Sequence, residues 1–165
     1  MILAAAAAAT ALQAAPYQDC KQITNIPGRE TVSLDGNWKT IVDQYETGYY
    51  DYRRKPMNER ASFFADDSFN RNRRRLVEYE FDAARELKVP GDWNTQREDL
   101  YRYEGTVWYR TKFKSEPREG RTFVYFGASN YETVVGLNGH VLGMHLGGFT
   151  PFNYDYITYN IKHKY

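Results

Sequence analysis

The sequence predicts an all-β protein built as a β-sandwich, and three observations support this. Short apolar runs alternate with Gly, Pro and Asn turn residues at intervals of about ten to fifteen residues, which is typical of sandwich strands. Between these runs we find no convincing amphipathic helical pattern. The chain also contains 15 Tyr, 9 Phe and 3 Trp, and aromatic rings favour strands because they pack well on a half-buried pleated surface.

The composition predicts a single globular domain with no affinity for polyanions. A chain of 165 residues buries roughly two-thirds of its unfolded surface, which is enough for a real core. Its 22 basic and 21 acidic residues leave a net charge of +1, so we expect no nucleic-acid partner. No run reaches the ~20 apolar residues of a membrane span. Cys20 is the single cysteine, which excludes a disulfide within the chain.

The first residues predict an export signal. Residues 1–15 form an alanine-rich apolar run that ends in small residues, as a secretory signal peptide does, although the usual basic start is missing. The alternative is an alanine-rich leader that is helical or disordered. We expect residues 16–30 to be a linker and residues 31–165 to be the folded domain. The export signal predicts a periplasmic or secreted protein.

The first strand pair is expected between residues 31 and 42. An apolar stretch at 31–34 is followed by an Asp-Gly-Asn turn at 35–37 and by an alternating strand at 38–42. Residues 43–75 interrupt this pattern, because they are polar and rich in Tyr and Arg. We interpret them as a solvated insertion loop or short helix rather than as a nucleic-acid patch.

Three further strands are expected in the middle of the chain. The strand expected at residues 87–89 should end before Pro90, because proline has no backbone N–H to donate to a strand ladder. Residues 107–114 alternate in polarity, so one face can meet a core and the other can meet water or a second domain. Residues 123–126 form a nearly continuous apolar run, which is typical of an inner strand buried on both sides.

A β-hairpin at Asn138 and Gly139 is the strongest local prediction. Two apolar runs flank this pair, and Asn-Gly is the dipeptide that best fits a two-residue type I′ turn. The strands on either side must therefore be antiparallel neighbours. After the second strand, Gly147 and Gly148 allow a tight turn and Pro151 ends the ladder.

Five motifs occur in order along the chain: Leu-Asp-Gly-Asn-Trp at 34–38, Val-Pro-Gly-Asp-Trp-Asn at 89–94, Tyr-Glu-Gly-Thr-Val-Trp-Tyr-Arg at 103–110, Leu-Asn-Gly at 137–139 and Gly-Met-His-Leu-Gly-Gly-Phe-Thr-Pro-Phe at 143–152. Taken together, they resemble the N-terminal domain of family 2 glycoside hydrolases, the group of β-galactosidases and β-glucuronidases. The resemblance covers roughly residues 32–155. Within this range, the sequences of residues 43–54 and 92–96 are most similar to those of β-glucuronidases of gut-type bacteria. Gly136 departs from the family pattern, which predicts a weaker strand or a bulge there.

The resemblance implies a jelly-roll-like sandwich of the galactose-binding-domain type, with a non-catalytic role in a longer enzyme. In that family the two carboxylates of a retaining glycosidase lie in a later barrel domain, so we expect no catalytic residue here. Whether this chain is itself an enzyme stays open. The implied parent enzyme hydrolyses terminal β-glycosidic bonds, as a β-glucuronidase first and a β-galactosidase second. The sandwich is expected to be incomplete at its C-terminus, which would leave the isolated chain marginally stable or prone to aggregation.

Tyr103 and Glu104 are the candidate substrate-binding residues. In the family, a loop before the Trp-Tyr-Arg strand leans toward the mouth of the barrel, which implies that both residues contact the substrate or frame its pocket. Residues 92–94 are expected to fix that loop instead. Trp108 and Arg110 are expected to pack against a neighbouring domain.

The sequence supports no cofactor and no metal site. His140 and His145 lie an odd number of residues apart in one expected strand, so they point to opposite faces. With His163 and Cys20 they form no metal-ligand pattern. We expect His145 to form a hydrogen bond within the Gly-Gly loop.

The expected partners are a carbohydrate with a β-glycosidic bond and the remaining domains of the parent enzyme, which could also form a homo-oligomer. Two alternatives stay open. The chain could be a free-standing carbohydrate-binding module, because aromatic rings stack on the apolar faces of sugars. It could also be an interaction sandwich that contacts no sugar.

Overall fold

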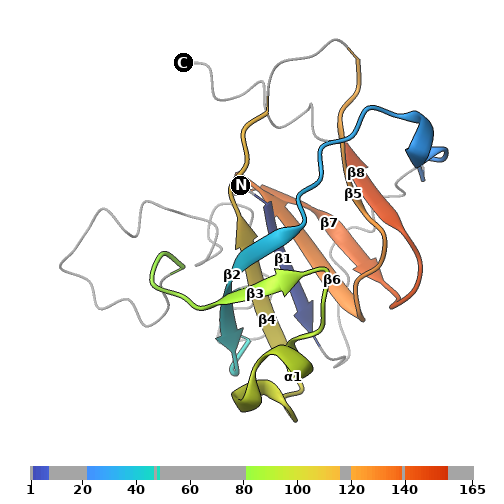
Figure 1. The fold of residues 1–165 in the computed structure, drawn as a ribbon. Helices are drawn as coiled ribbons and strands as arrows, with labels where there is room; N and C mark the ends of the chain where they lie inside the picture. The colour runs from blue at the N-terminus through green and yellow to red at the C-terminus, as the bar shows by residue number, and fades with distance from the viewer. Residues whose placement is uncertain are drawn as a thin grey trace.

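The computed structural model describes residues 2–7, 22–46, 48, 81–115, 120–138 and 140–155, and this part of the chain is all-β, as predicted (Figure 1). Six strands form one sheet in the order β3-β2-β4-β1-β6-β7, and two form a second sheet, β5-β8. The larger sheet consists of β1 (Ile2–Ala7), β2 (Gly36–Asp43), β3 (Glu86–Val89), β4 (Thr106–Thr111), β6 (Glu132–Leu137) and β7 (His140–Leu146), and the smaller sheet of β5 (Phe123–Phe126) and β8 (Phe152–Asp155).

Helical structure in the described residues is limited to single turns. They are η1 (Ile26–Gly28), α1 (Trp93–Gln96) and η3 (Glu98–Leu100). None of these helices has the length and apolar character needed to cross a membrane.

The main core lies between the two sheets and makes the fold a sandwich. Phe152 of β8 is its centre: its ring stacks on Phe126 at 4.8 Å and on His145 of β7 at 4.1 Å between ring centroids. Gly143 of β7 allows β8 to lie close to the larger sheet, because a Cβ at this position would lie 2.4 Å from the ring of Tyr154 in β8. The buried residues of this cluster come from both sheets and are Trp38, Val124, Val135, Leu137, Leu142, Phe152 and Tyr154.

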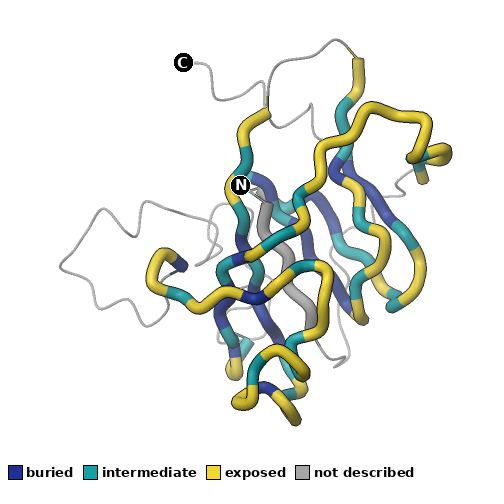
Figure 2. The backbone as a smooth tube through the Cα atoms, in the orientation of Figure 1, coloured by how far each residue is buried: buried dark blue, intermediate teal, exposed yellow. Residues whose placement is uncertain are grey.

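A second apolar cluster covers the opposite face of the larger sheet. It contains Ile41, Phe81, Trp108 and Val134, so neighbouring residues of β2, β4 and β6 point into different clusters, as strand geometry requires. Buried residues accordingly follow the central strands (Figure 2). The expectation that one face of the strand at 107–114 meets water or a second domain was wrong for Trp108 and Arg110, which pack against Phe81. It was right for Lys112, whose side chain is 62% exposed.

Two expected strands differ from the structure. Residues 31–34 form no strand, and β2 pairs with β3 and β4 instead. The Trp38 indole Nε1 donates to the Leu34 carbonyl at 2.8 Å, so a side-chain bond holds this segment where a ladder was expected. Strand β5 is not buried on both sides, since it pairs with β8 at one edge and its Tyr125 is 39% exposed.

The hairpin prediction is confirmed. Strands β6 and β7 are antiparallel, with Leu137 opposite His140, and Asn138 has the positive φ of 51° that such a turn requires. The expected irregularity at Gly136 is also present, because the register shifts between Val135 and Gly136. Gly139 lies outside the described residues.

The N-terminal residues contribute a strand to the larger sheet. Ile2–Ala7, which belong to the expected signal peptide, pair with β4 on one side and β6 on the other. Removal of residues 1–15 would take this strand away, so the expected leader and the observed strand are alternative uses of the same residues. The Ile23 amide, within the expected linker, donates to Asn153 Oδ1 at 2.9 Å. Most of the expected insertion at 43–75 lies outside the described residues.

Candidate functional site

The connection between β3 and β4, residues 90–105, carries both candidate substrate-binding residues and begins with a capped helical turn. The Asp92 carboxylate accepts hydrogen bonds from the Thr95 amide and the Thr95 hydroxyl, both at 2.8 Å. These two bonds lower the pKa of Asp92, because they favour the ionised carboxylate. The entry to the loop is therefore fixed by an N-cap.

Gln96, at the other end of α1, ties the loop back to β3. Its Oε1 accepts from the Lys88 amide at 2.7 Å, and its Nε2 donates to the Lys88 carbonyl at 3.0 Å. β3 is an edge strand of the sheet. The Gln96 amide therefore takes the place of a neighbouring strand and satisfies backbone groups that would otherwise be open.

Asn94 holds the far side of the loop together. Its Nδ2 lies 2.7 Å from the Leu100 carbonyl, 3.3 Å from that of Tyr101 and 3.4 Å from that of Tyr103. One primary amide thus gathers three backbone oxygens of a turn. This confirms the expectation that residues 92–94 fix the loop.

Tyr103 is a half-buried part of the loop framework. Its hydroxyl donates to the Thr106 carbonyl at 3.1 Å, and its ring meets Trp93 edge-on at 6.5 Å. Gly105 makes this possible, because its φ is 153° and a Cβ there would lie 2.6 Å from the Tyr103 hydroxyl. Since the hydroxyl points back to the backbone, only part of the ring is available to a ligand.

Glu104 is exposed beside Tyr103, and its carboxylate can accept hydrogen bonds from the hydroxyl groups of a sugar. Tyr101, on the same loop, has a ring that is 66% exposed, and the sequence reading did not single it out. The same loop, held by hydrogen bonds, thus carries an exposed carboxylate and an exposed aromatic ring, two types of group that can contact a sugar.

Tyr109 of β4 lies behind this loop and stays protonated at neutral pH. Burial, and secondarily the negative charge of Asp92, raise its pKa to about 12. Its hydroxyl is therefore not available as a base at neutral pH.

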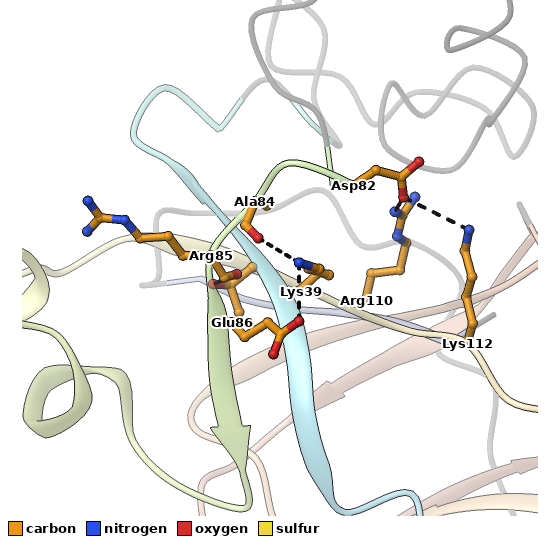
Figure 3. Close-up of polar contacts among 8 residues, drawn as sticks. Lys39, Asp82, Ala84, Arg85, Glu86, Arg110 and Lys112 are labelled. Carbon is orange, nitrogen blue, oxygen red and sulfur yellow. Dashed lines mark hydrogen bonds and ion pairs between the residues drawn. The ribbon is translucent and has the colours of Figure 1, made fainter.

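A cluster of charged residues lies at the margin of the sheet, where the chain enters β3 (Figure 3). The Arg110 side chain is 4% exposed and forms an ion pair with Asp82, and its guanidinium lies 4.5 Å from the centre of the Phe81 ring. Lys112 also faces Asp82 at 4.0 Å (Figure 3). Arg110 thus pairs with a residue of this domain, and Trp108 is buried in the outer cluster. The expectation that both residues pack against a neighbouring domain was therefore wrong.

A buried pair in the outer cluster was not anticipated from the sequence. The Trp108 indole Nε1 donates to Asp43 Oδ2 at 2.9 Å, and the Gly48 amide donates to the same oxygen at 2.8 Å. The signal that could have found it is Asp43 itself, an acidic residue at the end of an otherwise apolar strand, since a buried carboxylate needs a hydrogen-bond donor nearby.

His145 lies near the end of β7, and it contacts Thr150 on the far side of the Gly147-Gly148 turn, in line with the expected hydrogen bond. Its Nε2 is 3.1 Å from the Thr150 hydroxyl, its ring stacks on Phe152, and burial lowers its pKa. No group of three or more His, Cys, Asp or Glu side chains in the described part of the chain is arranged to hold a metal ion.

Comparison with known proteins connects this domain to enzymes that act on sugars. The chain is 28% identical to a β-glucuronidase of Bifidobacterium dentium, solved with coumarin-3-O-glucuronide; the TM-score is 0.51, and the match covers 74% of this chain and 16% of that one. A β-glucuronidase of an uncultured Clostridium sp. matches with 28% identity, a TM-score of 0.49 and coverage of 74% and 18%. A β-galactosidase of Thermoanaerobacter pseudethanolicus is 41% identical over 69 residues.

These relatives are glycosidases. The match to the Thermoanaerobacter enzyme covers 41% of this chain and 9% of that protein, so the chain spans a small part of each relative. No protein-family model matches it. The comparisons support a fragment related to glycosidases, with the β-rich fold of a sandwich domain.

Proposed function

We propose that this chain is the non-catalytic N-terminal sandwich domain of a family 2 glycoside hydrolase whose complete form hydrolyses terminal β-glycosidic bonds. The observation that carries the proposal is the likeness to the Bifidobacterium dentium β-glucuronidase, which extends along 74% of this chain at 28% identity. Apart from Gly139, the residues of the five motifs lie within the described part of the chain, and the motifs support the same assignment. The proposed location of the complete enzyme is the periplasm or the extracellular medium.

The preferred substrate class is a β-glucuronide, and a β-galactoside is second. The β-glucuronidase match extends over 74% of this chain, whereas the β-galactosidase match, although higher in identity, extends over 41%. We therefore give the longer match more weight. The domain's own role is to support the enzyme and to frame the substrate through the 90–105 loop.

Glu104 is the better of the two candidate contacts, because the Tyr103 hydroxyl already donates to the backbone. In the complete enzyme, Glu104→Gln should raise KM for the glycoside about threefold to tenfold and leave kcat nearly unchanged, as expected when binding shared by ground state and transition state is lost. The matched control is Glu98→Gln, another exposed carboxylate on the same loop. Equal kinetics for both variants would remove Glu104 from the site.

The test of the proposal is to sequence the source DNA beyond codon 165 and to assay two products on nitrophenyl β-glucuronide and nitrophenyl β-galactoside. We expect the open reading frame to continue, the longer product to hydrolyse one of the two glycosides, and the 165-residue chain to hydrolyse neither. Turnover by the short chain would contradict a non-catalytic role. A stop codon close to codon 165, together with glycan binding, would favour the free-standing carbohydrate-binding module instead.

A further inference from the structure

Exposed aromatic side chains gather at one end of the larger sheet. In the described part of the chain, seven large hydrophobic residues are exposed, and five of them lie at this end. Four of the five are aromatic, and exposed apolar groups that cluster in this way mark interaction sites. We call the group the aromatic end, and its members are Tyr45, Tyr101, Tyr131, Leu146 and Phe149.

The strand registers bring Tyr45 and Tyr101 to this end. Asp43, the last residue of β2, pairs with Thr106, the first residue of β4. Tyr45 follows the end of β2, and the loop that carries Tyr101 leads into β4. The end of β2 and the start of β4 lie on the lower side of the sheet in Figure 1.

The other three residues lie at the same end of β6 and β7. One residue of β1 pairs with the second residue of β4 on one side and with the second residue of β6 on the other, so β4 and β6 begin at the same end of the sheet. Glu132, the first residue of β6, pairs with Leu146, the last residue of β7. The Gly147 amide donates to the Tyr131 carbonyl at 2.8 Å, which joins the loop before β6 to the turn that carries Phe149.

Polar groups on the same loops indicate what the aromatic end can bind. Glu104 and Asn130 are exposed beside the rings, and their side-chain oxygens accept hydrogen bonds from hydroxyl groups. The core of a protein–protein interface is depleted of charged residues, so a carboxylate among the rings argues against a protein partner. A saccharide uses both kinds of group, because its pyranose rings have apolar faces and its hydroxyl groups are donors.

The charges of this end favour a neutral saccharide. The 90–105 loop has four acidic and two basic residues, which is a net charge of −2. The loop at 127–131 and the turn at 146–151 have no charged side chain. A saccharide made of uronic acids would bring its carboxylates close to charges of the same sign, which disfavours binding.

We propose that the aromatic end binds a neutral β-linked oligosaccharide, whose sugar rings stack on Phe149, Tyr131 and Tyr101 and whose hydroxyl groups donate to Glu104. Phe149 is the principal contact, because its side chain is 96% exposed and belongs to neither apolar cluster. The inference rests on the proposed function for one point, that the ligand is a carbohydrate. It extends the contact surface from the 90–105 loop to the loops beside β6 and β7.

The experiment measures saccharide binding to the full 165-residue chain by isothermal titration calorimetry. The probes are cellohexaose, mannohexaose and a hexamer of β-1,4-linked mannuronate, which differs from mannohexaose by a carboxylate on each ring. At least one neutral hexasaccharide should bind with a Kd of about 1 mM or lower. The mannuronate hexamer should bind at least about tenfold more weakly than mannohexaose or cellohexaose, because of the like charges.

This measurement is independent of the hydrolysis assay. If no neutral hexasaccharide binds while the longer product hydrolyses a glycoside, the inference fails and the proposed function stands. If a neutral hexasaccharide binds while no product hydrolyses a glycoside, the inference stands and the proposed function fails.

Variants of the full chain locate the bound saccharide. Phe149→Ala and Tyr131→Ala should each weaken binding at least about fivefold and keep the thermal midpoint of the native chain. Tyr125→Ala is the matched control, because Tyr125 is an exposed tyrosine of β5 outside the aromatic end, and it should bind as the native chain does. Glu104→Gln should reduce the discrimination against the mannuronate hexamer.

Three results would overturn the proposal. The first is equal affinity of the native chain, Phe149→Ala and Tyr131→Ala for the neutral hexasaccharides. The second is tighter binding of the mannuronate hexamer than of both neutral probes. The third is a dimer in sedimentation velocity that Phe149→Ala dissociates, together with no saccharide binding, which would identify a second copy of the chain as the occupant.

Discussion

At the scale of single residues, buried polar groups on the outer face of the sheet determine how β2, β4 and β6 can pack. Asp43 and Glu132 are both nearly inaccessible to solvent, yet their surroundings differ. Asp43 accepts hydrogen bonds from Trp108 and Gly48, whereas Glu132 is held near the negative charge of Glu46. A buried carboxylate with donors stabilises its neighbours, and one that faces a like charge destabilises the fold when it ionises.

Asp43→Leu should destabilise the domain by about 1–3 kcal/mol, because the Trp108 indole N–H would stay buried without its acceptor. Asp43→Asn keeps a side-chain oxygen in place and should cost less. Urea unfolding of both variants, and of each combined with Trp108→Phe, measures the coupling between the two residues. A coupling free energy of zero would mean that the observed bond contributes nothing to stability.

The raised pKa of the buried Glu132 carboxyl predicts that the domain loses stability at higher pH. Burial, and then the charge of Glu46, raise the pKa of Glu132 above 4.5. The folded state therefore binds the proton more tightly than the unfolded state. Its stabilising effect is complete below the unfolded pKa and is lost as pH rises through the folded pKa.

Glu132→Gln should remove this loss, so the variant should gain stability relative to the native chain from about pH 4.5 upward. Urea midpoints at several pH values between 4 and 8 provide the measurement. Glu98→Gln, at an exposed position, is the control and should follow the native pH dependence. Parallel curves for Glu132→Gln and the native chain would show that Glu132 does not carry the effect.

At the scale of elements, the distance between the two sheets depends on glycine in β7. Gly143 lies against the ring of Tyr154 in β8, where a Cβ would approach to 2.4 Å. Real Cβ atoms do not tolerate such a contact, so either the ring or the strand must move. The β6–β7 hairpin and β8 can therefore pack closely only with glycine at this position.

Gly143→Ala should cost about 1–3 kcal/mol through overpacking. Gly127→Ala is the matched control, because a Cβ at Gly127 meets nothing within 4 Å, and it should change stability by less than about 0.5 kcal/mol. Thermal unfolding followed by near-ultraviolet circular dichroism would report both the stability and the environment of the aromatic rings. Equal midpoints for the two variants would contradict the close contact.

At the scale of the whole molecule, two sheets of unequal size are held together by a small aromatic cluster. Phe152 contacts Phe126, His145 and Tyr154, which come from both sheets. Phe149, three residues earlier, is 96% exposed and takes no part in this cluster. The stability of the sandwich should therefore depend on one of these phenylalanines and not on the other.

Phe152→Ala should destabilise the domain by about 3–5 kcal/mol, which is a large part of the stability of a typical domain. Phe149→Ala should stay within about 0.5 kcal/mol of the native chain. Equilibrium unfolding monitored by tyrosine and tryptophan fluorescence compares the two. A small effect of Phe152→Ala would mean that the sheets are joined mainly by other residues.

Much of the fold could be predicted because its signals are local. The Asn-Gly turn at 138–139, the stop of β3 at Pro90 and the irregularity at Gly136 each depend on the backbone preferences of one or two residues. The sequence also located the loop that carries Tyr103 and Glu104. The hydrogen bonds that hold this loop connect residues at most ten positions apart.

The sequence by itself thus determined the class of the fold, most strand positions and the loop of the candidate site. Only the tertiary structure decided which faces are covered. Asp43 and Trp108 lie 65 positions apart, and β1 reaches β4 and β6 from the start of the chain. Patterns of alternation show that a strand has two faces, but not which distant segment packs on each. That choice depends on the combined burial and hydrogen bonding of the whole molecule.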